Sequence, residues 1–390
     1  MAFRCSSTVF MAGPARYPVS SSRVKPVEAS IRRALGFAAV TAALSCAPRT
    51  NGSPQVGAAE EVGTDEGPAL VRVVGRTEGP ATARRFSWSG VSLQARFFGT
   101  EVSVDLGGGD DDSFEVIVDG SRLPRLATTS GRKRYSIASG LANGAHELVL
   151  WRRTEANDGS PSTFYGLDVG GGRLLPFAPK RHRIEVVGDS ITCGYGNEGR
   201  NPCPFTYDTE NDYAAYGSVA ARALDADLHT ECWSGKGVSR NIDGTTSELM
   251  PELFTRVIAT DPASRWDFSW IPEAVVVNLG TNDFARGDPG RPYVTAYAAF
   301  VESLRERYPD AFVFLVIGPM LSGEKLAAAR GYLDEIVAAR KAAGDARIVH
   351  VLVETQSEAN GIGCDYHPSE KTHALMGEVV ASAIAKRLGW

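Results

Sequence analysis

A serine, an asparagine, a histidine and a glycine-rich turn occur in four short motifs that together could catalyse acyl transfer. In chain order these motifs are Gly188-Asp189-Ser190, Ser234-Gly235-Lys236-Gly237, Gly280-Thr281-Asn282-Asp283 and Asp365-Tyr366-His367. The neutral imidazole of His367 could accept the proton of the Ser190 hydroxyl and return it to a leaving group. Backbone N–H groups near Gly235 and the side-chain amide of Asn282 could stabilise the oxyanion that forms when an ester carbonyl is attacked. The motifs therefore predict a nucleophile, oxyanion donors and a base, in that order along the chain.

The elements that must position these motifs alternate between buried strands and helices. Apolar runs predict strands at 184–187, 228–233, 274–279, 311–317 and 347–351. Helical patterns predict helices at 214–226, at 292–308, at 324–343 and from the N-cap Ser369 to residue 388. Apolar strands that alternate with helices are typical of an α/β domain, with a parallel sheet covered on both faces. Because residues that follow the carboxyl ends of such strands share one edge of the sheet, we expect the four motifs to lie together there.

The preceding part of the chain, from about residue 69 to residue 167, has the alternating pattern of β-strands instead. Strands are expected at 92–97, 102–106, 114–118 and 146–151. Turn signals at Asp119-Gly120 and Asn143-Gly144 separate these runs, and no helical pattern lies between them, which predicts an all-β sandwich. Asp110-Asp111-Asp112 lacks the spaced oxygen ligands of a calcium loop, so we interpret it as a solvated turn.

The first residues of the chain have the pattern of an export signal. Arg32-Arg33 precedes an apolar run at 34–44 that is too short to span a bilayer. Ala43-Leu44-Ser45-Cys46 is similar to a bacterial lipoprotein box, which predicts cleavage before Cys46 and lipidation there, with simple secretion as the alternative. We expect an exported protein that is a cell-surface or periplasmic lipoprotein, or is secreted. The expected domains are an export signal at 1–46, a flexible linker at 47–66, the β-sandwich at 67–178 and the α/β domain at 179–390.

Charge is distributed unevenly along the chain. The formal net charge is −5, but residues 1–45 carry +5, so the remainder carries −10. An acidic body argues against nucleic acid or an anionic membrane surface as a partner. We therefore expect membrane contact only through a lipid on Cys46.

Four cysteines lie downstream of the predicted cleavage site, namely Cys193, Cys203, Cys232 and Cys364. Export would place them in a compartment where disulfides persist, and four cysteines allow three pairings. A Cys193–Cys203 bridge would staple the loop after Ser190, so it is the first pairing to test. The spacing of the cysteines matches no zinc-ligand pattern, and no metal site is expected.

The four motifs match the four sequence blocks of the SGNH (GDSL-type) hydrolases. Over about residues 70–390 the chain resembles carbohydrate esterase family two, most closely at 188–196, 234–237 and 365–369. This resemblance implies a flavodoxin-like three-layer α/β/α hydrolase domain preceded by a β jelly roll. It also implies hydrolysis of O-acetyl esters of carbohydrate, with a preference for O-6 of hexopyranose units and with no cofactor.

The same resemblance implies a role for each motif. Ser190 would be the nucleophile and His367 the base. The oxyanion donors would be the Ser190 N–H, the Gly235 N–H and the Asn282 side chain.

The motif around the histidine departs from the pattern of many SGNH hydrolases. These enzymes place an aspartate three residues before the histidine, where this chain has Cys364, while Asp365 lies two residues before it. We therefore predict a Ser190–His367 dyad supported by Asp365, whose carboxylate or whose backbone carbonyl orients the imidazole. Asp189 and Asp283 are predicted to be structural, and His373 to be a packing or capping residue.

Three aromatic residues, Tyr195, Trp233 and Tyr366, could form a stacking platform for sugar rings.

A lipid or thioester acyl hydrolase is an alternative function, disfavoured because no long apolar lid segment lies near the motifs. A non-catalytic carbohydrate-binding protein is another, disfavoured by the complete serine and histidine pair. The first strand is followed neither by a Gly-x-Gly-x-x-Gly turn nor by a Gly-x-Ser-x-Gly turn, so a cofactor-binding domain and the α/β-hydrolase triad are both set aside.

Overall fold

The structure is a computed structural model, and it describes residues 62–63, 69–156 and 161–390. The predicted export signal, the lipidation site at Cys46 and nearly all of the predicted linker lie outside the described residues. None of the helices in the described part of the chain combines the length and the apolar character needed to cross a membrane.

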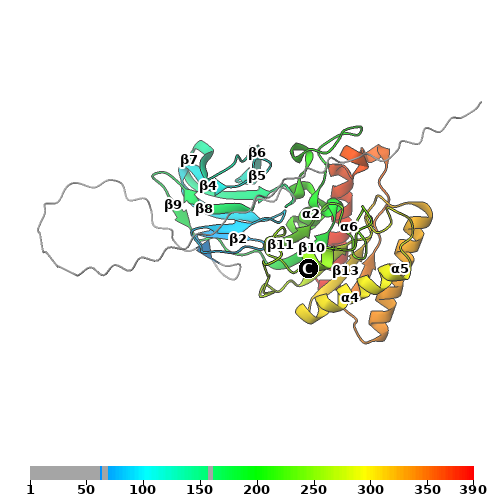
Figure 1. The fold of residues 1–390 in the computed structure, drawn as a ribbon. Helices are drawn as coiled ribbons and strands as arrows, with labels where there is room; N and C mark the ends of the chain where they lie inside the picture. Colours follow the sequence, from blue (N-terminus) through cyan, green and yellow to red (C-terminus); the bar gives the residue numbers. More distant parts are fainter. Residues whose placement is uncertain (1–61, 64–68, 157–160) are drawn as a thin grey trace, which may run out of the picture. The chain divides into compact units, whose positions relative to one another are not determined.

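The N-terminal part forms a 9-stranded sheet in which every pairing but one is antiparallel, the exception being β1 with β2 (Figure 1). Its strands are β1 (Val62–Gly63), β2 (Val71–Val74), β3 (Arg84–Phe86), β4 (Ser92–Gly107), β5 (Ser113–Val118), β6 (Ser121–Ala127), β7 (Lys133–Arg152), β8 (Ser162–Asp168) and β9 (Arg173–Leu175). Residues 92–95 of β4 pair with β2, whereas residues 103–107 pair with β8. The long strands β4 and β7 stay paired with each other along both stretches, and buried aromatic side chains such as Phe97 and Phe164 fill the core. The all-β prediction is confirmed.

Two details of the predicted strands were wrong. The runs expected at 92–97 and 102–106 belong to the single strand β4, because register shifts between Gly99 and Glu101 and between Val102 and Ser103 let pairing continue. For the same reason Asn143-Gly144 lies within β7 instead of ending it. The turn predicted at Asp119-Gly120 does join β5 to β6, and both residues have positive φ angles, of 50° and 75°.

The C-terminal part holds a 5-stranded parallel sheet with the strand order β11-β10-β12-β13-β14. Its strands are β10 (His182–Gly188), β11 (Ala226–Cys232), β12 (Ala274–Asn278), β13 (Phe312–Val316) and β14 (Ile348–Val351). Its helices are α1 (Ser190–Cys193), α2 (Tyr216–Ala223), α3 (Met250–Leu253), α4 (Arg291–Arg307), α5 (Gly323–Ala342) and α6 (Glu370–Leu388), with 3-10 turns at Tyr207–Thr209, Asp212–Ala214, Glu358–Asn360 and Cys364–Tyr366. The order reverses at β10, where open α/β sheets place their binding crevice.

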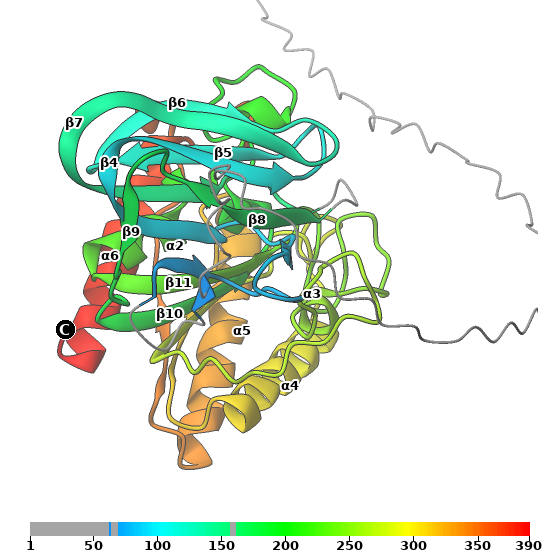
Figure 2. The same ribbon diagram turned by 90° about the vertical axis from the view of Figure 1, so that its left-hand side faces the viewer.

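Both faces of this sheet are covered, as the continuous burial of β11, β12 and β13 requires. Val186 and Val276 belong to the apolar cluster under α2 and α6, while Val187 and Val277 belong to the cluster under α4 and α5. Figure 2 shows these two helix pairs on either side of the sheet. The α/β prediction is confirmed, although the helix expected over 214–226 ends earlier. Asp225 has a φ of 49°, which ends that helix and lets β11 begin at the next residue.

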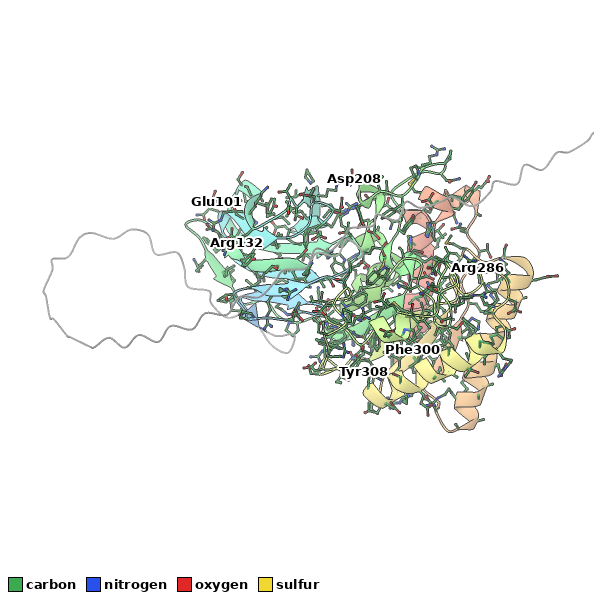
Figure 3. All side chains as sticks on the ribbon, viewed as in Figure 1. Glu101, Arg132, Asp208, Arg286, Phe300 and Tyr308 are labelled. Carbon is green, nitrogen blue, oxygen red and sulfur yellow. A yellow bond between two sulfur atoms is a disulfide. The ribbon has the colours of Figure 1, made fainter. Side chains whose placement is uncertain are left out.

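Buried ion pairs join the N-terminal sheet to the parallel sheet. Arg76, which follows β2, lies 2.9 Å from Glu185 and 2.9 Å from Glu231, and all three side chains are at most 1% exposed. The hydroxyl of Tyr308, a residue that Figure 3 labels, donates to the same Glu185 carboxylate at 3.3 Å. Nearby, Arg72 pairs with Asp227 at 2.6 Å. Because an unpaired buried charge is costly, these contacts bind the two sheets into one structural unit.

Candidate active site

Ser190 begins α1, directly after the tight turn that follows β10. The Asp189 carboxylate caps α1 by accepting the Ile191 N–H at 3.0 Å, which fixes the first turn of the helix. Gly188 leaves room for this turn, since a Cβ there would lie 2.0 Å from the Thr192 hydroxyl oxygen. The Ser190 side chain therefore stands at the carboxyl end of β10, and 6% of the residue is exposed.

His367 lies against Ser190 in the geometry of a nucleophile and its base. Its Nε2 atom is 2.9 Å from Ser190 Oγ, and its Nδ1 atom is 3.1 Å from the backbone carbonyl oxygen of Asp365. A carbonyl can only accept, so the Nδ1–H donates to Asp365 and Nε2 is left to accept a proton from the serine. Burial lowers the pKa of His367 to about 4, which keeps the imidazole neutral near pH 7.

The carboxylate of Asp365 does not contact the imidazole. It accepts the Tyr195 hydroxyl at 2.9 Å and the Phe205 N–H at 3.0 Å. Asp365 and Tyr366 both have left-handed backbones, with φ angles of 48° and 62°, and this conformation places the Asp365 carbonyl next to the ring. The sequence leaves open whether the carboxylate or the backbone carbonyl of Asp365 contacts the imidazole. In the structure the carbonyl does so, and the carboxylate holds the surrounding loop through Tyr195 and Phe205.

The disulfides are Cys193–Cys232 and Cys203–Cys364, so the pairing chosen for the first test, Cys193–Cys203, was wrong. Cys193 ends α1 and lies 5.5 Å, measured between Cα atoms, from the last residue of the neighbouring strand β11. The backbone carbonyl of Cys203 accepts the Asp365 N–H at 3.0 Å. This bond places Cys203 next to Cys364. One bridge thus fixes the turn after Ser190, and the other fixes the loop that carries His367.

The remaining predicted oxyanion donors lie next to the serine turn. The Asn282 amide donates to the Lys236 carbonyl at 2.8 Å and to the Asp189 carboxylate at 3.3 Å, so it joins three of the four motifs. Gly235 has a φ of 80°, and its carbonyl accepts the Ile242 N–H at 2.9 Å. The structure therefore brings the four motifs together at one edge of the sheet.

Two acidic residues and one histidine near the site have structural roles, as the sequence predicts. Asp283 accepts the N–H groups of Val238, Ser239 and Arg240 at 3.0, 2.8 and 3.0 Å. Asp189 is fully buried, and burial raises its pKa to about 7. His373 is also buried and accepts the Tyr216 N–H at 3.3 Å.

The three predicted platform residues differ in their surroundings. The Tyr195 ring has its centroid 4.0 Å from that of Phe205 and 4.1 Å from that of His367, so both of its faces are occupied. The structure therefore argues against Tyr195 as an open stacking surface and places it as a support for the histidine loop. Trp233 is half-buried beneath the Lys236 ammonium, which lies 5.4 Å from its ring. Tyr366 is 67% exposed and remains available to a ligand.

Two residues that no motif identified also reach the site. Phe205 stacks on Tyr195, and Glu155, from the N-terminal part, accepts the Ser234 N–H at 2.7 Å. Neither residue stands near a recognisable pattern, because each contact joins segments that are far apart in the chain. Phe205 also lines a hollow of about 360 Å³, together with Asp110, Asp111, Tyr207 and Asp208.

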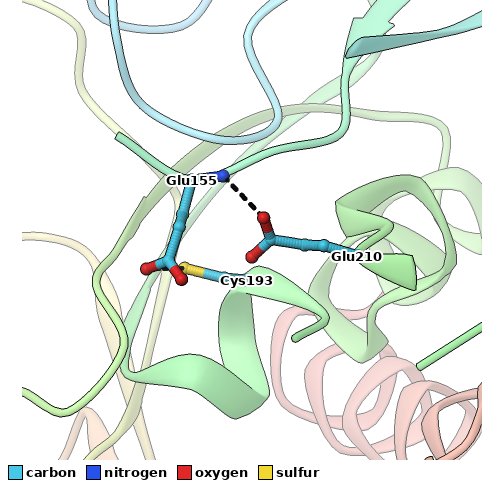
Figure 4. Close-up of side chains that lie close together, drawn as sticks. All are labelled: Glu155, Cys193 and Glu210. Carbon is cyan, nitrogen blue, oxygen red and sulfur yellow. Dashed lines mark hydrogen bonds between the residues drawn. The ribbon is translucent and has the colours of Figure 1, made fainter. Parts of the chain in front are cut away.

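Two groups of described side chains are close enough to share a metal ion, but their donors are already committed. The first is Glu155, Cys193 and Glu210, in which the sulfur is bonded to Cys232 and is no thiolate (Figure 4). The second is Glu185, His229 and Glu231, whose two carboxylates contact the Arg76 guanidinium. Neither group offers the free donors that a metal centre requires.

Comparison with known families agrees with this arrangement. Residues 73–179 match the family described as "Carbohydrate esterase 2 N-terminal", and residues 186–375 match the "GDSL-like Lipase/Acylhydrolase family". The fold and the site together define a carboxylic ester hydrolase of the GDSL type.

Solved and curated relatives narrow this class. The structure of a family two carbohydrate esterase from Clostridium thermocellum, in complex with cellohexaose, is 39% identical, with a TM-score of 0.79 over 82% of this chain and 99% of the other. The chain belongs to carbohydrate esterase family two. The cellulase/esterase CelE of Acetivibrio thermocellus is 41% identical over 78% of this chain, which spans 38% of CelE. An acetylxylan esterase / glucomannan deacetylase of Cellvibrio japonicus is 28% identical over 82% of this chain and 89% of its own length.

Proposed function

We propose that the protein is an exported carbohydrate deacetylase that removes O-acetyl groups through an acyl-enzyme on Ser190. The observation that carries this proposal is the 2.9 Å contact between Ser190 Oγ and His367 Nε2, with the opposite ring nitrogen held by the Asp365 carbonyl. Family membership supports an ester substrate, and the names of the relatives support an acetylated glycan.

The first half-reaction transfers the acetyl group to the enzyme. Ser190 Oγ attacks the acetyl carbonyl carbon while its proton moves to His367 Nε2. The N–H groups of Ser190 and Gly235 and the Asn282 amide stabilise the oxyanion, and the longer contact from Asn282 to Asp189 is the one that the oxyanion would replace. Collapse of the tetrahedral intermediate breaks the bond to the sugar oxygen, which takes the proton from His367.

The second half-reaction restores the enzyme. A water molecule gives one proton to His367 Nε2 and attacks the acetyl carbon, and a second tetrahedral intermediate forms. Its collapse breaks the bond from the acetyl carbon to Ser190 Oγ, and the proton on His367 returns to that oxygen. The second proton of the water leaves on the acetic acid, which ionises to acetate in solution. The imidazole is neutral at the start of each half-reaction, as its lowered pKa allows.

The substrate that we propose is a primary, O-6 acetyl ester on a hexopyranose unit, carried by an oligosaccharide or a polysaccharide. A primary ester projects from the ring and can reach a serine that is only 6% exposed. The exposed Tyr366 ring beside His367 offers a stacking surface for the sugar. The xylan and glucomannan of the relatives' names are the first polymers to test.

We also propose that the chain is exported, by cleavage before Cys46 with lipidation or by simple secretion. The two disulfides support this proposal, because such bonds persist in oxidising compartments. Labelling of the expressed protein with a radioactive fatty acid, compared between the wild type and Cys46→Ala, distinguishes lipidation from secretion.

Acetate release from a panel of acetylated glycans tests the proposed activity. We expect release by the wild type and none above background by Ser190→Ala, with the 6-O-acetylated members turned over fastest. p-Nitrophenyl acetate and p-nitrophenyl palmitate serve as short-chain and long-chain references. Failure to release acetate from every glycan, with turnover of the palmitate ester, would favour a lipid acyl hydrolase instead.

A further inference from the structure

Glu155 links the N-terminal sheet to the loop that carries Gly235. It follows β7 by three residues, yet its Oε2 atom accepts the Ser234 N–H at 2.7 Å. The residue is 1% exposed, and the same oxygen lies 3.8 Å from the sulfur of Cys193, at the end of α1 (Figure 4). The Glu155 carboxylate therefore contacts both the loop that carries Gly235 and the helix α1, which begins with Ser190.

The backbone of Glu155 is itself held firmly. Its N–H donates to the Glu210 carboxylate at 3.0 Å (Figure 4). The guanidinium of Arg153 donates to the Glu210 carbonyl at 3.3 and 3.2 Å and pairs with Glu115 on β5 at 3.1 Å. These contacts fix the backbone from which the Glu155 carboxylate reaches Ser234.

Ser234 immediately precedes the predicted oxyanion donor Gly235. Beyond Ser234, the loop is held at the Gly235 carbonyl by the Ile242 N–H and at the Lys236 carbonyl by the Asn282 amide, at 2.9 and 2.8 Å. The bond from Ser234 to Glu155 fixes the loop on its other side. On that side the Trp233 N–H also donates to the Gly188 carbonyl at 3.3 Å, and the Lys236 N–H donates to the Trp233 carbonyl at 3.2 Å. Glu155 is the group that holds the Ser234 N–H itself, so its loss would loosen the Trp233–Ser234 peptide and, next to it, the peptide that carries the Gly235 N–H.

We propose that Glu155 is a positioning residue for the oxyanion hole, and that it acts by holding the Ser234 amide. Because Glu155 follows β7, the N-terminal sheet would then contribute directly to the geometry of the active site. This inference rests on the proposed function, because it assumes that the Gly235 N–H binds an oxyanion.

To hold the Ser234 N–H, the side chain at position 155 needs an acceptor oxygen at the distance that glutamate provides. Burial raises the pKa of Glu155 to about 7, so a neutral side chain of equal length suits this position. Glutamine keeps a carbonyl oxygen at the same distance and can accept the Ser234 N–H. Aspartate keeps the charge, but its oxygen is withdrawn by one methylene.

The test compares Glu155→Gln with Glu155→Asp in the full chain, using p-nitrophenyl acetate and an acetylated glycan. We expect Glu155→Gln to keep kcat within about threefold of the wild type, and Glu155→Asp to lower kcat about 10- to 100-fold with KM within about twofold. Thermal unfolding is followed by circular dichroism for each variant, and the assays are run at a temperature where all of them are folded. Glu155→Met serves as a second variant that lacks any acceptor, and its kcat should fall at least as far as that of Glu155→Asp.

Asp227→Asn is the matched control. Asp227 is a buried acid that joins the same two parts of the molecule, but it lies at the opposite end of β11 from Ser234. We expect this variant to lose stability and to keep the kcat of the wild type. An equal fall in kcat for Asp227→Asn and Glu155→Asp would overturn the proposal, since general loosening would then explain both.

Ser190→Ala separates this inference from the proposed function. If Ser190→Ala is inactive and Glu155→Asp keeps the kcat of the wild type, the positioning role is wrong and the proposed function stands. If Ser190→Ala keeps its turnover, the proposed function falls, and the positioning role falls with it.

Discussion

His367 is oriented by the main chain of Asp365 and not by its carboxylate. The distance from His367 Nδ1 to the Asp365 carbonyl oxygen is 3.1 Å, while the carboxylate binds Tyr195 and the Phe205 N–H. A carbonyl is uncharged, so it fixes the tautomer of the imidazole without a strong attraction for its protonated form. The Ser190 hydroxyl, the His367 imidazole and the Asp365 backbone carbonyl therefore form one continuous chain of hydrogen bonds.

Substitution at residue 365 should be much less harmful than substitution at residue 367. We expect Asp365→Asn to lower kcat less than about tenfold, because the carbonyl remains and the amide oxygen can still accept one bond from the loop. His367→Ala should lower kcat by about 10³-fold or more, since it removes the base. Equal losses for the two variants in steady-state assays would mean that the carboxylate is an essential member.

The pH dependence of kcat/KM should reveal the lowered pKa of the base. Burial lowers the pKa of His367 to about 4, and only the neutral imidazole can accept the serine proton. Activity should therefore be retained as the pH falls from 7 to 5 and be lost as it falls through about 4. A rate profile between pH 3 and pH 8 checks this expectation. An acid limb near 6.5, the ordinary value for histidine, would contradict it.

The disulfide Cys203–Cys364 should matter for activity as well as for stability. It closes a sequence separation of 161 residues and lies next to Asp365, so its removal frees the loop that carries His367. We expect the double variant Cys203→Ser/Cys364→Ser to lose about 2–5 kcal/mol of unfolding free energy. At a temperature where it is folded, its kcat should also fall. Unchanged kcat in the folded variant would show that Tyr195 and Phe205 suffice to hold the loop.

Arg76 should be among the most sensitive positions for stability. Arg76→Met removes the cation between Glu185 and Glu231, which are buried and would be left without a compensating charge. We expect a loss of about 3–5 kcal/mol in denaturant unfolding. Arg134→Met is the control, because that side chain is 54% exposed and its pairs with Asp105 and Asp168 should contribute about 1 kcal/mol or less. Similar losses for both variants would contradict this account of the buried cluster.

The sequence predicts the sheet and the four motifs well because both depend on local pattern. The strand β12, for example, is a run of apolar residues between polar segments, and the motifs follow strand ends whose common edge is set by topology. The local pattern also predicts two strands, at 92–97 and 102–106, where the structure has one, because a register shift inside β4 leaves no distinct mark in the sequence.

Contacts between distant segments could not be predicted in this way. The pairing of Cys193 with Cys232 depends on where α1 meets β11, and the contact of Glu155 with Ser234 joins residues 79 positions apart. The backbone conformation that brings the Asp365 carbonyl to His367 requires a positive φ at a non-glycine residue, which the surrounding fold imposes. Such features follow from tertiary packing and not from composition or periodicity.

The central claim is that Ser190 carries the acetyl group during turnover. Acid quenching of the enzyme during reaction with an acetylated glycan, followed by mass spectrometry of the peptide that contains Ser190, tests this claim directly. We expect one acetyl group on Ser190 in the wild type and an unmodified peptide in Ser190→Ala, which should release no acetate. Acetate release by Ser190→Ala at the rate of the wild type, with no acetyl group found on Ser190, would contradict the account.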